Sequence, residues 1–371
     1  MKSLIDDGPG PDHGHGSDTA GWLEITASRN NLSGRASAGP PRMLICGDIG
    51  GTKVLLALAE FKDGAMHFRL RRRYLTKDYP GLDAMFADFM RIAGDAALYP
   101  GDITGGCLAV AGPVAEHGRS ARLTNLPWEI DAAALAGAHG TGPIRLVNDF
   151  AAAAAGIDAI GADALVDLQK GEPQARGARL VIGAGTGLGT ATLVWHGGAE
   201  GGYRPQPGEG GHMSFAPTDA TQDQLVAYLR GRGERATNEH VVSGMGLANI
   251  HQFFLSMGKP GTPGANPEQI SQSALADPQG AAGLALDLFF CAYGQVAGDL
   301  ALAVLARGGV YIAGGIAARI LPQLQASGFV AAFNDKAPQD ALVRRFPVRV
   351  VTDLDLGLKG AARIAAGLPQ L

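Results

Sequence analysis

The stretch MLICGDIGGTKVLLALAE, Met43 to Glu60, decides the fold. It predicts a strand over 43–46, a turn containing Gly47, Gly50 and Gly51, and a second strand over 54–59. Because glycine has no Cβ, such a turn brings backbone N–H groups close together, where they can bind phosphate oxygens. Asp48 adds a carboxylate where a magnesium ion beside those oxygens would sit. For this segment alone, a plain β-hairpin with a flexible loop is an equal alternative.

A second stretch of the same kind favours the phosphate interpretation. Residues 179–195 read RLVIGAGTGLGTATLVW, and on alignment Gly47 falls on Gly183 and Gly51 on Gly187. Each glycine pair lies between two predicted strands, and an internal repeat of this kind indicates two related units. We therefore expect two related domains that face each other, each offering a glycine hairpin to one nucleotide between them.

Two common phosphate-binding motifs are absent from these stretches. A P-loop needs Gly-Lys-Ser/Thr followed by a helix, but here Lys53 follows Thr52 and VLLALA suits a buried strand. The dinucleotide fingerprint G-x-G-x-x-G opens a helix, but the sixth position from Gly183 is Leu188, and TATLVW favours a strand.

Composition bounds the class of protein. A chain of 371 residues, 46% hydrophobic and 18% charged, is long enough for two globular domains. A net charge of −4 argues against a nucleic-acid partner. The three cysteines, at 46, 107 and 291, are widely separated, which excludes a disulfide framework or zinc cluster and fits a reducing cytoplasm.

The first 42 residues differ from the rest. They are rich in Gly, Pro, Ser, Asp and His, with an apolar group only at 22–25, so we expect a disordered N-terminal extension. His13 and His15 suggest a metal site, but two histidines in such a tail are more often solvated. The chain has no run of about 18 uninterrupted apolar residues, so no membrane association is expected.

Hydrophobic periodicity and turn residues divide the remaining chain into strands and helices. Beyond the two hairpins we predict strands over 66–76, 106–112, 144–147, 310–313 and 348–351. We predict helices over 82–98, 131–138, 221–230, 281–305, 316–325 and 357–366, the last packing back on the first domain.

Polar residues follow the strand 144–147. Asn148 and Asp149 directly precede FAAAAAGI, which is predicted to be helical. In α/β sheets ligands bind beyond the carboxyl ends of strands, so Asp149 could accept a proton there. The alternative is that Asp149 only caps the helix.

Three further polar or glycine-rich segments are candidates for binding. Glu209 and His212 lie three residues apart in GEGGHMSFAP, where they could bind a metal or grip neighbouring sugar hydroxyls. Glu239, taken alone, reads as a solvated helix residue. Gly314 and Gly315, at a strand-to-helix joint, would let a flat ring or phosphate approach the helix N-terminus.

Taken in order, the motifs GDIGGT (47–52), TN (124–125), VNDF (147–150), GAGTGLG (183–189), GEGGH (208–212), NEHVVSG (238–244) and AGG (313–315) resemble those of the bacterial glucokinase family, within the sugar kinase, hexokinase and actin-like ATPase superfamily. The resemblance runs from Met43 to the C-terminus. It implies an α/β, two-domain actin-like ATPase (ribonuclease H-like) fold with a cleft between the lobes. The expected domains are 43–155 plus 350–371 (small) and 156–349 (large).

The same resemblance implies an ATP-dependent hexose kinase that phosphorylates the 6-hydroxyl of glucose, uses ATP and Mg²⁺, and forms a homodimer. Asp149 would be the catalytic base and Asp48 the metal ligand. The sugar ligands would be Asn125, Asn148, Asp149, Glu209, His212 and Glu239. The nucleotide would contact Gly47, Asp48, Ile49, Gly50, Gly51, Thr52, Lys53, Gly185, Thr186, Gly187, Gly314 and Gly315.

The sequence departs from the family at one position and leaves alternatives open. Lys53 stands where relatives of the enterobacterial enzyme often have Asn, and MSFAP after His212 lacks the cysteines of the zinc-binding branch. A sugar-sensing repressor would need a DNA-binding module that the first 42 residues do not predict. A filament-forming ATPase would leave Asp149, Glu209 and Glu239 without a purpose. Another hexose, or polyphosphate as donor, stays possible.

Overall fold

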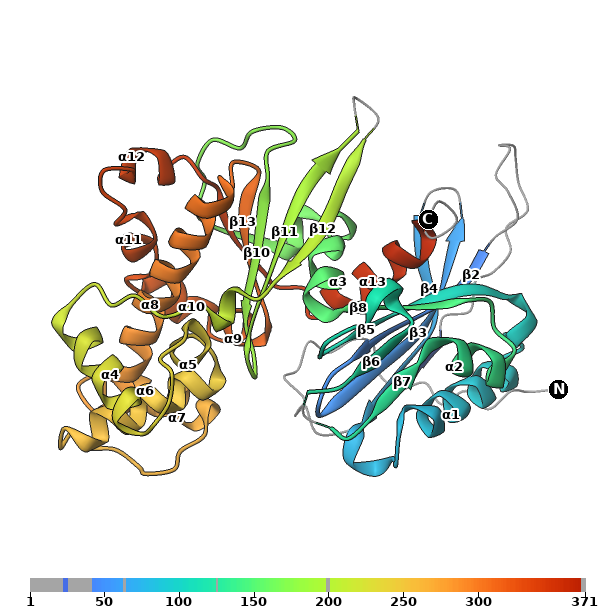
Figure 1. Cartoon of the computed structure of the whole chain (residues 1–371), viewed down its shortest axis with the longest axis horizontal. Coiled ribbons are helices and arrows are strands. Elements are labelled where there is room, and N and C mark those ends of the chain that lie inside the picture. Colours follow the sequence, from blue (N-terminus) through green and yellow to red (C-terminus); the bar gives the residue numbers. More distant parts are fainter. Residues whose placement is uncertain (1–22, 26–41, 63–64, 125, 198–200, 368–371) are drawn as a thin grey trace.

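The computed structural model describes residues 23–25, 42–62, 65–124, 126–197 and 201–367. They form two α/β lobes with the helices α3 (Asp149–Gly156) and α13 (Leu356–Gly367) between them (Figure 1). Each lobe is built on its own six-stranded sheet.

The first sheet has the order β1-β4-β3-β2-β5-β8. Strands β2, β3 and β4 form an antiparallel meander, and β5 and β8 run parallel to β2. The bounds are β1 (Leu23–Ile25), β2 (Arg42–Ile49), β3 (Lys53–Lys62), β4 (Ala65–Leu75), β5 (Ile103–Val110) and β8 (Ile144–Asn148). A separate small hairpin joins β6 (Ser120–Arg122) to β7 (Glu129–Asp131).

The second sheet repeats this plan in the order β12-β11-β10-β13-β14-β9. Strands β10, β11 and β12 form the antiparallel meander, and β13 and β14 run parallel to β10. The bounds are β9 (Leu165–Gln169), β10 (Arg179–Ala184), β11 (Leu188–His196), β12 (Gly202–Gly208), β13 (Gly309–Ala313) and β14 (Val348–Val351). The predicted repeat is therefore confirmed: three antiparallel strands, then two parallel ones, occur in both lobes.

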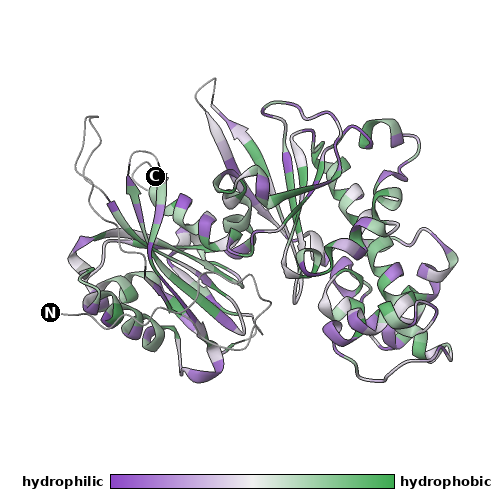
Figure 2. Ribbon diagram, turned by 180° about the vertical axis from the view of Figure 1, so that it is seen from behind, coloured by the Kyte–Doolittle hydropathy of each residue, from purple (hydrophilic) through white to green (hydrophobic). Residues whose placement is uncertain are grey.

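Both faces of the first sheet are covered. Helices α1 (Leu82–Asp95) and α2 (Ala132–His139) pack on the face that carries Ile45 and Leu56. The opposite face, with Leu44 and Cys46, is covered by α13. The alternation follows from the period of two along a strand, and both faces are apolar (Figure 2). The last helix thus packs back on the first lobe, as predicted.

The second lobe carries most of the helices, on the side of its sheet away from the first lobe (Figure 1). They are α4 (Ala220–Gly231), α5 (Asn238–Val241), α6 (Gly244–Ser256), α7 (Pro267–Ala276), α8 (Ala281–Val304), α9 (Gly315–Arg319), α10 (Leu321–Ala326), α11 (Phe329–Asn334) and α12 (Asp340–Val343). Short 3₁₀ helices are η1 (Thr76–Asp78), η2 (Pro100–Asp102), η3 (Glu116–Gly118), η4 (Ile157–Ala159), η5 (Ala162–Ala164) and η6 (Gly210–His212).

Helix α8 is the core helix of this lobe. Among the described residues it alone is long and apolar enough to cross a membrane, but 83% of its apolar window is buried inside the protein. Its hydropathy is therefore explained by packing against the surrounding helices.

Two sequence predictions need correction. The helix predicted over 316–325 is two short helices, α9 and α10, separated at Ile320; Pro322, in the first turn of α10, has no N–H with which to continue the α9 ladder. Gly47 and Asp48 were expected in the turn but lie in β2, paired with Leu56 and Leu55. Position 47 is glycine because a Cβ there would lie 2.9 Å from side-chain carbons of Leu56 and Leu108.

Helices α3 and α13 touch backbone to backbone where the lobes meet. A Cβ at Gly360 of α13 would lie 1.7 Å from the carbonyl oxygen of Ala152, and one at Gly156 of α3 would lie 2.3 Å from that of Leu356. These glycines permit the close crossing.

The N-terminal extension and the domain limits are described only in part. Strand β1 pairs with β4 inside the segment predicted to be disordered, at the apolar group noted there. The rest of residues 1–41, with His13 and His15, lies outside the described residues. The domain limits stay a prediction, although Val350 and Val351 belong to the second sheet through β14.

Candidate active site

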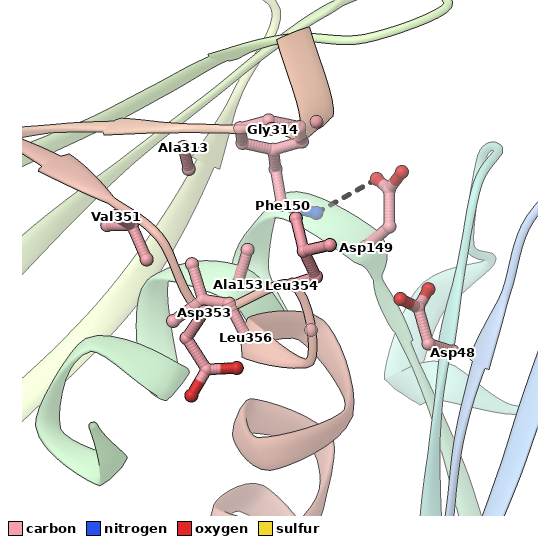
Figure 3. A pocket seen from close by; sticks show the side chains of 12 residues that line it. Asp48, Asp149, Phe150, Ala153, Ala313, Gly314, Val351, Asp353, Leu354 and Leu356 are labelled. Carbon is pink, nitrogen blue, oxygen red and sulfur yellow. Dashed lines mark hydrogen bonds between the residues drawn. The ribbon is translucent and has the colours of Figure 1, made fainter. Parts of the chain in front are cut away.

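A pocket of about 200 Å³ lies where the two lobes meet. Its walls come from the end of β2, the start of α3, the end of β13 and the segment between β14 and α13 (Figure 3). The lining residues are Asp48, Asp149, Phe150, Ala153, Ala313, Gly314, Gly315, Val351, Asp353, Leu354, Leu356 and Gly357. The structure thus brings Asp48, Asp149, Gly314 and Gly315 together, as predicted, although they are up to 267 positions apart in the chain.

Asp48 projects into this pocket from β2. Its pKa is raised to about 6, mainly by burial and then by the neighbouring charge of Asp149, against the opposing effect of Lys53. The missing side chain of Gly357 makes room for the Asp48 carboxylate, because a Cβ at position 357 would lie 2.9 Å from Oδ2.

Asp149 opens α3, but Asn148 is the residue that caps the helix. The Asn148 side-chain oxygen accepts hydrogen bonds from the backbone N–H groups of Phe150 (3.0 Å) and Ala151 (3.1 Å). Asp149 Oδ1 also accepts from the Phe150 N–H (2.9 Å), which orients the carboxylate. Burial raises the pKa of Asp149 to about 6, even though backbone hydrogen bonds act to lower it. Since Asn148 provides the cap, capping does not account for the carboxylate at 149.

A divalent cation would offset the repulsion between the carboxylates of Asp48 and Asp149. Burial raises the pKa of both carboxyl groups, and the charge of Asp149 contributes to the raised pKa of Asp48. Magnesium takes one or two protein carboxylates and otherwise keeps water and substrate phosphate oxygens. No cluster of three or more His, Cys, Asp or Glu side chains that could hold a metal occurs among the described residues.

The second glycine hairpin stands beside the pocket. The ring of Phe150 packs where Cβ atoms at Gly183 and Gly189 would be, 2.7 and 1.9 Å from its carbons. Gly314 has φ of +86°, and a Cβ there would lie 2.6 Å from the Ala184 carbonyl oxygen. The close approach of β10, β13 and α3 therefore depends on glycine at all three positions.

The first hairpin turns at residues 50–52. Its turn is closed by a bond from Gly50 N to Lys53 O (3.0 Å). Thr76, the first residue of η1, supports the turn by donating through Oγ1 to the Gly51 carbonyl (2.9 Å). Thr52 is exposed at the tip, and Ile49 is a core residue with no exposed surface.

Glu209 and His212 form an exposed pair. Their carboxylate and imidazole lie 3.7 Å apart, with 83% and 65% of the side chains exposed. The loop itself is fixed: Gly210 N donates to Thr190 Oγ1 (3.0 Å), and Asn238 Nδ2 donates to the Gly210 carbonyl (2.9 Å). After burial and backbone hydrogen bonding, the charge of Glu209 is a further influence on the pKa of Asp149, which it raises.

Glu239 is partly exposed and does not line the pocket. Its Oε2 accepts a hydrogen bond from Leu188 N (2.8 Å), just after the turn formed by Gly185, Thr186 and Gly187. That turn, like Asn148, Glu209 and His212, does not line the 200 Å³ pocket. Asn125, predicted as a sugar ligand, lies outside the described residues.

Sequence reasoning missed one wall of the pocket. It is formed by Phe150 and by Asp353, Leu354, Leu356 and Gly357 in VTDLDLGLKG. The sequence did contain one signal for this wall: Gly357 stands at the start of the last predicted helix, where no turn requires a glycine.

Comparisons with known proteins agree with this arrangement. The glucokinase family model matches residues 45–368. The glucokinase of Nostoc punctiforme (strain ATCC 29133 / PCC 73102) is 38% identical over 350 residues, covering 88% of this chain and 99% of the relative. The crystal structure of a glucokinase from an Antarctic psychrotroph has a TM-score of 0.75 at 28% identity, covering 88% and 99% of the two chains.

A third protein shares the fold at lower identity. The glucokinase from Balamuthia mandrillaris, solved in complex with glucose, has a TM-score of 0.71 at 21% identity, covering 89% of this chain and 95% of that one. The two-domain actin-like ATPase (ribonuclease H-like) fold with a cleft between the lobes is thus confirmed. From the family match and the extent of these similarities, the chain belongs to the glucokinase family.

Proposed function

We propose that the protein is an ATP-dependent glucokinase that transfers the γ-phosphoryl group of ATP to the 6-hydroxyl of glucose. The observation that carries this is the meeting of Asp48, Asp149 and Gly314 in one pocket between two repeated lobes. The family membership and the glucokinase relatives support the same activity.

In this proposal ATP lies between the lobes. Its phosphates rest against the hairpins at 50–52 and 185–187, and its adenosine lies near Gly314 and Gly315. Phosphoryl transfer needs positioning and charge neutralisation more than covalent help. Mg²⁺ bound near Asp48 supplies part of that neutralisation.

Glucose is held beside the start of α3. Asn125, Asn148, Glu209, His212 and Glu239 supply hydrogen-bonding groups for its hydroxyls. Asp149 takes the proton of the 6-hydroxyl as that oxygen attacks the γ-phosphorus in line. The raised pKa of Asp149 suits this role, because a base works best with a pKa near the operating pH. Closure of the lobes excludes water, which would otherwise compete as acceptor.

A coupled assay of ADP release over a panel of hexoses tests the proposal. We expect release with glucose and little without sugar. Release of ADP without any sugar would indicate a filament-type ATPase. No ADP release with any hexose, together with no sugar phosphate formed from polyphosphate, would indicate a sugar sensor. A higher kcat/KM for another hexose would reassign the substrate. Formation of glucose 6-phosphate with polyphosphate in place of ATP tests the donor.

A further inference from the structure

Two hydrogen bonds from the segment 239–244 hold the turn of the second glycine hairpin. Leu188 N donates to Glu239 Oε2 (2.8 Å), and Gly244 N donates to the Gly185 carbonyl (2.8 Å). The turn is also closed internally by a bond from Gly185 N to the Gly187 carbonyl (2.8 Å). The segment 239–244, at α5 and the start of α6, therefore sets where this turn lies.

The contact with Glu239 is close enough to dictate the residue at 187. A Cβ at Gly187 would lie 2.4 Å from Glu239 Oε2 and 3.1 Å from its carboxyl carbon, so any larger residue would displace the carboxylate. Gly187 does not have a positive φ. Its lack of a side chain is thus explained by the carboxylate beside it.

The same short helix also holds the loop of Glu209 and His212. Asn238, the neighbour of Glu239, is 6% exposed and donates through Nδ2 to the Gly210 carbonyl (2.9 Å). Ser243 Oγ donates to the Glu239 carbonyl (2.7 Å), which fixes α5 against α6. Two adjacent residues therefore connect the loop assigned to glucose with the hairpin assigned to phosphate.

We infer that Glu239 is a positioning residue that holds the phosphate hairpin through Oε2 and thereby couples hexose binding to nucleotide binding. This rests on the proposed function, which places hexose hydroxyls at the same carboxylate. A hydroxyl bound to Glu239 restricts the carboxylate, and the restricted carboxylate restricts the Leu188 N–H and the turn before it. Because such coupling is reciprocal, bound nucleotide tightens hexose binding by the same factor.

Calorimetric titration of MgADP, with and without saturating glucose, tests the inference. Glu239→Ala removes a charge-assisted hydrogen bond, so we expect its Kd for MgADP without glucose to rise about tenfold. We also expect glucose to stop changing that Kd. Glu239→Gln keeps an oxygen that accepts from Leu188 N, so its Kd for MgADP should stay near wild type while its Kd for glucose rises.

A matched control separates this effect from loss of a glutamate in general. Glu268 occupies the second position of α7, as Glu239 does in α5, and its side chain is exposed. Glu268→Ala should leave both affinities unchanged. If Glu239→Ala binds MgADP as tightly as wild type, or if Glu239→Gln binds it as poorly as Glu239→Ala, the positioning role is wrong.

A second variant covers the case in which Glu239→Ala does not fold. Gly187→Ala pushes the carboxylate from the opposite side, so the Kd for glucose should rise although residue 187 lies in the phosphate hairpin. An unchanged glucose Kd in a folded Gly187→Ala protein would overturn the inference. The proposed function fails separately, when wild-type protein releases no ADP with any hexose; the MgADP affinities need no turnover.

Discussion

Asp48 and Gly357 come from the two ends of the folded chain and share one small space. An ideal Cβ on Gly357 would lie 2.9 Å from Asp48 Oδ2 and 3.3 Å from its carboxyl carbon. The start of the last helix therefore determines where the first hairpin's carboxylate can be.

Gly357→Ala should displace that carboxylate and lower kcat/KM for ATP. Small displacements of catalytic groups reduce rates strongly, and we expect a loss of about ten- to a hundredfold. Gly367→Ala is the control, because that residue lies in the same helix with no atom within 4 Å of its Cβ position. Equal steady-state constants for the two variants would show that Asp48 does not depend on Gly357.

Protonation of Asp149 should lower the activity at acid pH. Because burial raises its pKa to about 6, the carboxylate is protonated below that pH and cannot accept the hydroxyl proton. We expect kcat/KM for glucose to fall as pH decreases through about 6. Asp149→Asn should lower kcat by ~10²–10⁴ and abolish this decrease at acid pH. Near-normal turnover of that variant would remove Asp149 from the role of base.

Asp48 should lower the stability of the free protein at neutral pH. Its folded pKa of about 6 exceeds the ordinary aspartate value of 3.8, so the folded state binds the proton more tightly than the unfolded state does. The resulting destabilisation is present above pH 6 and disappears as pH falls to the unfolded value. Without nucleotide or metal, Asp48→Asn should therefore raise Tm by about 2–4 °C at pH 8. The same substitution should leave Tm unchanged near pH 3.5. Thermal melts at both pH values measure this; a lower Tm at pH 8 would contradict it.

The contact between Phe150 and the second hairpin should be sensitive to added volume. A Cβ at Gly189 would lie 1.9 Å from Phe150 Cδ2, so Gly189→Ala should destabilise the fold by about 1–3 kcal/mol. Gly202→Ala, in the same sheet with nothing within 4 Å, should have little effect. Adding Phe150→Leu should restore part of the loss in urea titrations. Additive effects would mean that the two residues do not meet.

The repeat and the polar residues after β8 were predictable because each follows from a local pattern. Glycine turns between apolar strands, and Asp149 after a strand end, need no knowledge of distant partners. The position of Gly47 was predicted wrongly because glycine in a strand can mark a tight packing site as well as a turn. The pairing of Gly357 with Asp48 joins residues 309 positions apart, and no sequence period relates them.

The same distinction applies to Glu239. Its place on a helix was predictable, but its bond to Leu188 depends on how α5 docks against β11. In contrast, the break between α9 and α10 had a local signal, Pro322, that the helical period of 316–325 concealed.

The position of α13 has a consequence for synthesis of the chain. The first lobe's sheet is complete once residue 148 is made, but the apolar face with Leu44, Cys46 and Cys107 is covered by Leu358, Ala361 and Ala365. A chain emerging from the ribosome therefore carries an uncovered hydrophobic sheet until its last helix is translated. The N-terminal lobe cannot finish folding first, and a product truncated before α13 should bind chaperones or aggregate.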